Sequence, residues 1–209
     1  MKAKEGRVLR MAATKYSMSF TTGALFYHES VKIVELFSYL KQWEKVREAV
    51  VAENVVQART TNTLKRVTNE VISRLKTLSE QELAFFAEAP YADRGYILWL
   101  AICRRYAFIG DFAVDIIHEH FISLKNTVTY DDYAVFFNKK SEWHSEIDRV
   151  AVSTRRKLRQ TLFQILREAN LLDKNNTIIP VTPGAGFQKL LASVEGRETL
   201  FFPIPGLVR

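Results

Sequence analysis

The strongest chemical signal in this sequence is a group of basic side chains at the expected start of a helix. Between positions 149 and 167 there are six arginines or lysines and no acid. Arginine and lysine pair with phosphates and reach guanine, and glutamine can pair with adenine. Helical periodicity over residues 153–170 puts an apolar stripe on one side and leaves most of the basic and amide side chains outside. The candidate DNA contacts here are Arg155, Arg156, Lys157, Arg159 and Gln160.

A second helix, expected from Thr61 to about Leu78, has a similar division of its surface. Its apolar stripe includes Leu64, Val71 and Leu75, and Glu70 is the only acid between positions 59 and 76. An ordinary solvated helix more often mixes Glu and Lys at i, i+4 spacing. An ordinary solvent-exposed face that contacts no DNA stays open as the alternative. The reason is that the turn before this helix is longer than the usual three or four residues of a helix-turn-helix. The candidate contacts are Thr61, Asn62, Lys65, Arg66 and Asn69.

The basic start of the 153–170 helix is poor for the stability of that helix in isolation. Positive charge near a helix N-terminus opposes the macrodipole by ~0.3–1 kcal/mol for each cation. An external polyanion would remove this conflict. Residues 171–181 then read as two apolar pieces around a turn, which predicts a hairpin where a winged helix places its wing. Lys174 lies in that turn and is a further candidate DNA contact.

Catalysis has little support in the sequence. His118 and His120 project about 200° apart on a helix, so they cannot share a metal. The glycines near Pro183 have neither phosphate-loop nor dinucleotide spacing, and no setting for a Ser or Cys nucleophile is recognisable. We expect no enzyme activity, no metal and no cofactor.

Composition sets wider limits. The chain has 209 residues, a net charge of +7 and one cysteine, Cys103, which lies in an apolar run that indicates core. The basic first 15 residues are not followed by the apolar segment of a signal peptide. The apolar run at 96–103 is shorter than the ~20 residues that span a bilayer. We therefore expect a soluble, cytoplasmic protein.

Few glycines and prolines and repeated helical periodicity predict an all-α globular fold. We expect an N-terminal helical region over 1–125, with a first helix-turn-helix at about 43–78. A C-terminal winged-helix-like region over 126–209 would hold the second. Ser79 and Thr129 are expected to cap helices, and Gly110 to separate two others. The Phe/Pro-rich tail at 200–205 is either a docking strip or part of the core.

Several segments together resemble the BrxA family, a small core component of BREX phage-exclusion systems. The likeness extends from about residue 16 to 182, and it rests on the order and number of the segments. They are 16–23 (YSMSFTTG), 53–60 (ENVVQART), 63–66 (TLKR), 104–106 (RRY), 132–137 (DYAVFF) and 154–160 (TRRKLRQ).

This resemblance implies an all-helical protein that binds double-stranded DNA through two helix-turn-helix units, as a monomer. It also implies host defence beside a methyltransferase and ATPases that carry the chemistry. Two alternatives stay open. An RNA-binding protein of the antitermination (NusB-like) type is one, and a protein–protein adaptor within the defence complex is the other.

Overall fold

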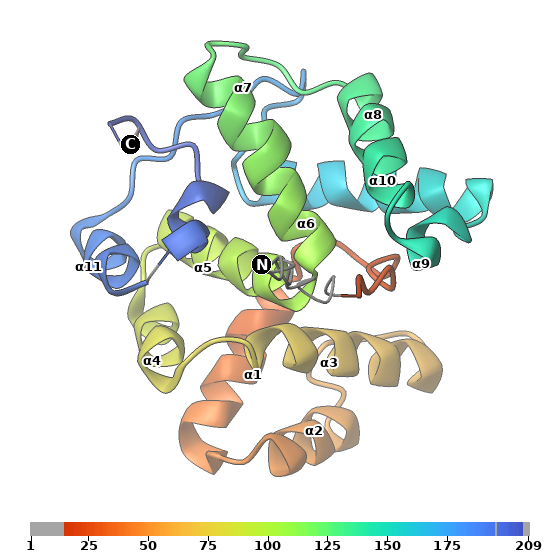
Figure 1. The fold of residues 1–209 in the computed structure, drawn as a ribbon. Coiled ribbons are helices and arrows are strands. Elements are labelled where there is room, and N and C mark those ends of the chain that lie inside the picture. The colour runs from red at the N-terminus through yellow and green to blue at the C-terminus, as the bar shows by residue number, and fades with distance from the viewer. Residues whose placement is uncertain (1–14, 195, 207–209) are drawn as a thin grey trace, which may run out of the picture.

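The computed structural model describes residues 15–194 and 196–206, and it is all-α (Figure 1). No helix in these ranges is long and apolar enough to cross a membrane. The elements in chain order are α1 (Tyr27–Leu40), α2 (Trp43–Ala52), α3 (Thr61–Leu75), α4 (Glu80–Glu88), α5 (Tyr91–Arg105), α6 (Ala107–Phe112), a π-helix η1 (Ala113–His118), α7 (Glu119–Ile122), α8 (Tyr130–Ser141), α9 (Ser145–Asp148), α10 (Val152–Glu168), α11 (Ala185–Ser193) and a 3₁₀ helix η2 (Gly196–Phe201).

Local sequence signals set several helix boundaries. Both expected caps are confirmed: Ser79 and Thr129 form capping boxes with Glu82 and Asp132, respectively. Each box satisfies two backbone N–H groups that a helix start leaves without partners. After α2, Asn54 has a positive φ of 48°, the left-handed conformation that often ends a helix.

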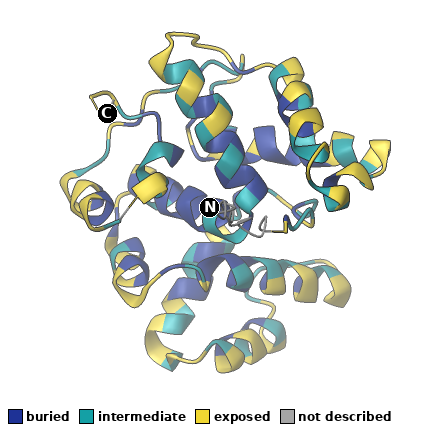
Figure 2. Cartoon of the chain, in the orientation of Figure 1, coloured by how far each residue is buried: buried dark blue, intermediate teal, exposed yellow. Residues whose placement is uncertain are grey.

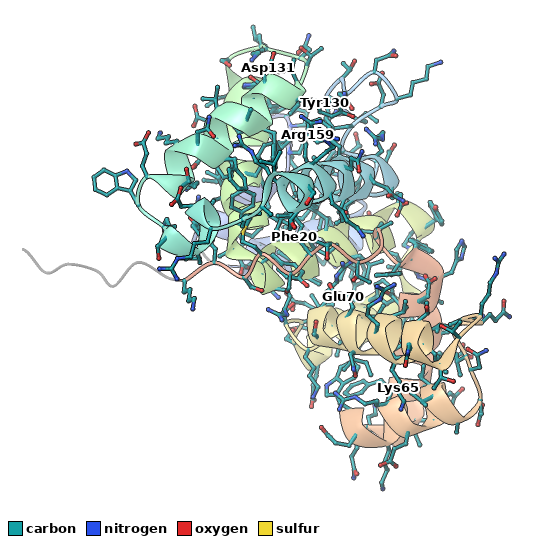
Figure 3. All side chains as sticks on the ribbon, turned by 90° about the vertical axis from the view of Figure 1, so that its right-hand side faces the viewer. Phe20, Lys65, Glu70, Tyr130, Asp131 and Arg159 are labelled. Carbon is teal, nitrogen blue, oxygen red and sulfur yellow. The ribbon has the colours of Figure 1, made fainter. Side chains whose placement is uncertain are left out.

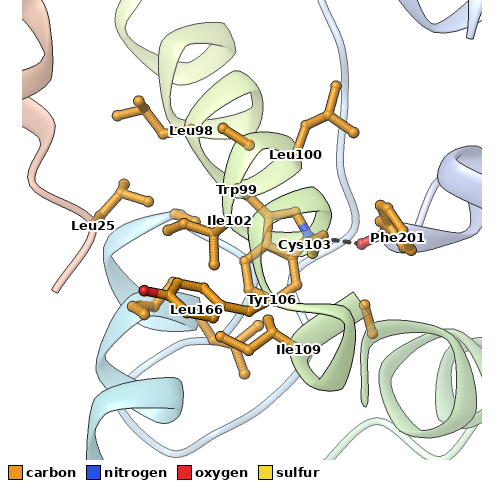
Figure 4. Close-up of a cluster of buried hydrophobic side chains, with 14 of the residues drawn as sticks. Leu25, Leu98, Trp99, Leu100, Ile102, Cys103, Tyr106, Ile109, Leu166 and Phe201 are labelled. Atoms are coloured by element: carbon orange, nitrogen blue, oxygen red, sulfur yellow. Dashed lines mark hydrogen bonds between the residues drawn. The ribbon is translucent and has the colours of Figure 1, made fainter. Parts of the chain in front are cut away.

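Helix α5 is mostly buried in the core of the molecule (Figure 2). Leu25 and Phe201 belong to the same buried cluster as its side chains (Figure 4). Trp99 is fully buried, and its indole N–H donates to the carbonyl of Phe201 at 2.9 Å. Phe202 is 1% exposed and packs against Tyr96 and Phe187. These tail residues therefore belong to the core, which excludes the docking strip for the Phe201–Phe202 pair.

The expected break at Gly110 is wrong. The chain bends at Tyr106, between α5 and α6, and Gly110 lies inside α6. A Cβ at this glycine would come within 3.1 Å of the Cys103 carbonyl and 3.3 Å of the Phe201 ring. Glycine thus allows close packing of α6 against α5 and the tail, and it does not interrupt a helix.

The predicted hairpin after α10 is reduced to a tight turn. The N–H of Asp173 donates to the Thr177 carbonyl at 2.9 Å, and the N–H of Asn176 to the Asp173 carbonyl at 3.0 Å. Two isolated antiparallel bridges, Leu172 with Ile178 and Thr127 with Thr177, are the β-structure in the described ranges. The segment before α8 thus pairs beside the turn that follows α10.

Two clusters of ion pairs join elements that are distant in sequence. Arg104 of α5 pairs with Glu82 at 2.7 Å and with Glu198 of the tail at 2.7 Å. Asp111 of α6 pairs with Lys140 of α8 at 2.6 Å. Burial by itself would raise the pKa of both Glu82 and Asp111. Their hydrogen-bonded cations outweigh it, so both pKa values are lowered.

These lowered values predict acid lability. A carboxyl whose folded pKa lies below its unfolded value, about 4, adds stability above that value and loses it as the pH falls through the folded pKa. We expect the midpoint temperature of thermal unfolding to decrease as the pH is lowered from about 5 to about 2.5. Glu82→Gln should flatten this dependence, whereas Glu80→Gln on the exposed side of α4 should not. A midpoint constant down to about pH 3 would contradict the assignment.

Candidate nucleic-acid interface

The first helix-turn-helix unit consists of α2 and α3, joined by a turn that is long but rigid. Asn54 closes this turn: its side-chain oxygen accepts the N–H of Ala58 at 2.9 Å, and its amide donates to the Ala58 carbonyl at 3.0 Å. Gln57 has a positive φ of 54°. Thr60 then caps α3 by accepting the N–H of Thr63 at 3.2 Å. The extra length is therefore folded back on itself and leaves the start of α3 fixed.

Helix α3 presents the expected residues to solvent. Leu64, Val71 and Leu75 are buried, as the periodicity predicts. The candidate contacts on the opposite face are all exposed: Thr61, Asn62, Lys65, Arg66 and Asn69. Among the described residues, neither Lys65 nor Arg66 forms an ion pair with an acid.

The second unit is formed by α8, the short α9 and α10. Leu158, Leu162 and Ile165 of α10 are fully buried, which fixes its inner side. The exposed candidates from this region are Arg156, Lys157, Gln160 and, in the turn after α10, Lys174. Arg156 and Lys157 have no acidic partner within the described chain. The first turn of α10 has no acid either.

Arg155 and Arg159 lie elsewhere, between α10 and α8. The guanidinium of Arg155 lies 4.2 Å from the Phe137 ring and donates to the Ala134 carbonyl at 3.2 Å. That of Arg159 lies 4.3 Å from the Tyr130 ring. Both are half-buried cation–π contacts that hold the two helices together. DNA contact by these two arginines stays a prediction, and the structure gives them a packing role.

Arg66 of α3 and the outer face of α10 line one groove of about 710 Å³, which we call the interhelix groove. Figure 3 shows the segment around Phe20 running between the helix that bears Arg159 and the helix that bears Glu70. The groove is lined by Arg66 from α3, by Lys157 and Gln160 from α10, and by Thr21, Thr22 and Gly23 from this segment. No sequence pattern indicated that these three residues lie beside the two basic helices.

Adjacent backbone groups of the 20–25 segment tie both helices together. The Ala24 carbonyl accepts from buried Arg74 of α3 at 2.7 Å, and the Leu25 N–H donates to Glu168 of α10 at 2.8 Å. Arg74 also pairs with Glu70 at 2.7 Å, and Glu70 accepts the Tyr106 hydroxyl at 2.7 Å. Burial and this bond raise the pKa of Tyr106 to about 12. The two units are thus held in a fixed relation.

The described residues contain no group of three or more His, Cys, Asp or Glu side chains that could hold a metal. His118 and His120 belong to neighbouring elements, η1 and α7, and His120 contacts the Thr127 carbonyl at 3.0 Å. Cys103 is fully enclosed in the core, where burial raises its pKa.

The fold and the groove define an all-helical protein with two helix-turn-helix units, both of which contribute a cation to one groove. The chain belongs to the BrxA family, whose model matches residues 14–194. It is 25% identical over 187 residues to the BREX protein BrxA of Escherichia coli O9:H4 (strain HS), covering 84% of this chain and 88% of that protein. It is 24% identical over 158 residues to the BREX protein BrxA of Bacillus cereus (strain H3081.97), covering 75% and 78%.

A solved structure shares the fold. The crystal structure of an uncharacterized protein from Magnetospirillum magneticum superposes with a TM-score of 0.77 at 16% sequence identity. The match covers 91% of this chain and 98% of that one. At this identity the likeness concerns architecture alone.

Proposed function

We propose that this chain is a non-enzymatic, double-stranded DNA-binding component of a BREX phage-exclusion system. The observation that carries the proposal is the set of exposed cations on α3 and α10, of which Arg66 and Lys157 line the same groove. Lys65, Arg66, Arg156 and Lys157 are exposed and form no ion pair among the described residues. Such cations are available for phosphates, and phosphate contacts dominate duplex affinity.

Helix α10 provides the stronger electrostatic argument. Four bases between positions 155 and 159 crowd the first turns of a helix whose N-terminus is already positive. Two of them, Arg155 and Arg159, are partly offset by aromatic rings of α8. Arg156 and Lys157 have no such compensation within the described chain. Phosphate groups at this surface would relieve their repulsion, so α10 is assigned the larger share of the binding energy.

Helix α3 carries the side chains better suited to reading bases. Asn62 and Asn69 are exposed on the same face as Lys65 and Arg66. Asparagine pairs with adenine through two hydrogen bonds, and arginine with guanine. We assign α3 to contacts in the major groove, mainly through its first half, as recognition helices commonly do.

The turn after α10 is the counterpart of a wing. In winged helices, a hairpin follows the recognition helix and contacts DNA beside it. Here the bridges of Leu172 with Ile178 and Thr127 with Thr177 hold the turn beside the segment that precedes α8. Lys174 is exposed at the tip of this turn, and we assign it to a backbone phosphate.

The assignment to a BREX system is supported by the relatives, each of which is named a BREX protein. In the proposal the chain acts as a monomer, and the DNA chemistry of the system lies with partner proteins, a methyltransferase and ATPases. The role of the chain itself is to bind duplex DNA.

The salt dependence of binding tests the proposal. With roughly six to eight phosphate contacts, log K should fall with log salt at a slope of about −5 to −7. Gel shifts of a short duplex between about 50 and 200 mM salt measure this slope. A structured RNA of equal length is the comparison, because the deep, narrow major groove of A-form RNA would exclude α3 and α10. An affinity for the duplex that does not change with salt concentration, or a clear preference for the RNA, would contradict the proposed binding to duplex DNA through phosphates.

A further inference from the structure

The 20–25 segment lies at the centre of the proposed interface, although it belongs to neither helix-turn-helix unit. Thr21, Thr22 and Gly23 line the interhelix groove together with Arg66 of α3 and Lys157 of α10. A duplex that contacts both Arg66 and Lys157 would lie across this groove. The inference therefore rests on the proposed function, and it concerns what the segment offers to the DNA.

The segment is rigid because both of its ends are anchored in the core. Phe20 and Leu25 are 0% and 1% exposed. The Ala24 carbonyl is held by Arg74, and the Leu25 N–H by Glu168. A ligand that binds here would therefore meet donors already in place, which lowers the entropic cost of ordering them.

The part of the segment that lines the groove offers neutral hydrogen-bond donors: Gly23 is exposed, and Thr21, Thr22 and Ala24 are partly buried. Within the described residues, the hydroxyls of Thr21 and Thr22 and the N–H groups of Gly23 and Ala24 make no hydrogen bond. Gly23 has a φ of 75°, and a Cβ there would lie 1.8 Å from the Phe26 ring. Glycine thus permits this backbone path and leaves the donors uncovered by a side chain.

The charges around the segment favour an anion that spans the groove. Arg66 and Lys157 flank it from opposite sides. Two acids also line the groove. Glu168 is already bound to the Leu25 N–H and to the Gln164 amide, and Glu29 lies in the first turn of α1, where a helix N-terminus stabilises it.

We propose that Thr21, Thr22 and Gly23 form a third DNA-binding element, which donates hydrogen bonds to a backbone phosphate where the duplex crosses from α3 to α10. Hydroxyl and backbone N–H donors of this kind fix the position of a protein on DNA without reading its sequence. Their contribution should therefore be equal for all sequences.

The double variant Thr21→Val/Thr22→Val tests the site, because it keeps the shape of both side chains and removes both hydroxyls. Fluorescence anisotropy with a short labelled duplex at several salt concentrations should show roughly tenfold weaker binding. The slope of log K against log salt should stay unchanged, because no charge is removed. Lys157→Ala should instead reduce that slope by about one.

Two matched variants separate donation from packing. Thr21→Ser/Thr22→Ser retains the hydroxyls and should bind as the parent chain does, and Thr182→Val, at an exposed threonine that does not line the groove, should have no effect. Parental affinity in the double valine variant, or equal weakening in the serine variant, would overturn the inference while Lys157→Ala still supports the proposed function. Failure of the parent chain itself to bind the duplex would instead overturn that function.

Discussion

Duplex binding should weaken by roughly 30- to 100-fold at about 100 mM salt when Arg156, Lys157 and Gln160 are replaced together by alanine. These three side chains are exposed on α10, and the sequence from 149 to 167 contains no acid to offset them. The variant Lys65→Ala/Arg66→Ala should weaken binding less, by roughly tenfold. Anisotropy titrations of the same labelled duplex measure both effects.

The matched control is Gln188→Ala/Lys189→Ala on α11, which removes an exposed amide and an exposed cation that do not line the interhelix groove. It should bind as the parent chain does, apart from a small effect of net charge. If the α3 variant lost more affinity than the α10 variant, the first unit would be the main DNA contact and the ranking above would be wrong.

The variant Arg74→Leu should lower the free energy of unfolding by about 2–4 kcal/mol, because it leaves the partly buried carboxylate of Glu70 without its cation. Arg74 is 3% exposed, and it links Glu70 of α3 with the Ala24 carbonyl. Urea denaturation followed by circular dichroism measures the loss.

The double variant Glu70→Gln/Arg74→Leu separates charge from packing. It removes the lone carboxylate and retains an amide that can accept the Tyr106 hydroxyl, so it should be more stable than Arg74→Leu alone. A loss below about 1 kcal/mol in the single variant would mean that Arg74 does not hold the first unit to the body of the fold.

Sequence periodicity predicted the parts of this molecule that depend on neighbours along a helix. It gave the buried stripe and the exposed face of α3 and of α10, because residues three and four apart share a face. The capping boxes at Ser79 and Thr129 were equally local, and the structure confirms both.

Features that depend on distant segments could not be predicted in this way. Arg159 packs on Tyr130, 29 positions earlier, so its partly buried state had no local signal. Gly110 was expected to break a helix, but the approach of the Phe201 ring is what requires it. The interhelix groove joins position 21 to position 157, and no spacing rule connects them. The sequence thus indicated candidate side chains, and the fold brings three of them, Arg66, Lys157 and Gln160, to one groove.

The central claim is that the exposed faces of α3 and α10 contact duplex DNA, and lysine labelling tests it most directly. The full chain is acetylated with and without saturating duplex at low salt, and the modified lysines are quantified by mass spectrometry. Lys65 and Lys157 should lose most of their reactivity on duplex addition and regain it at high salt, while Lys189 on α11 stays unchanged as the internal reference. Full reactivity of Lys65 and Lys157 in the saturated complex would contradict the account.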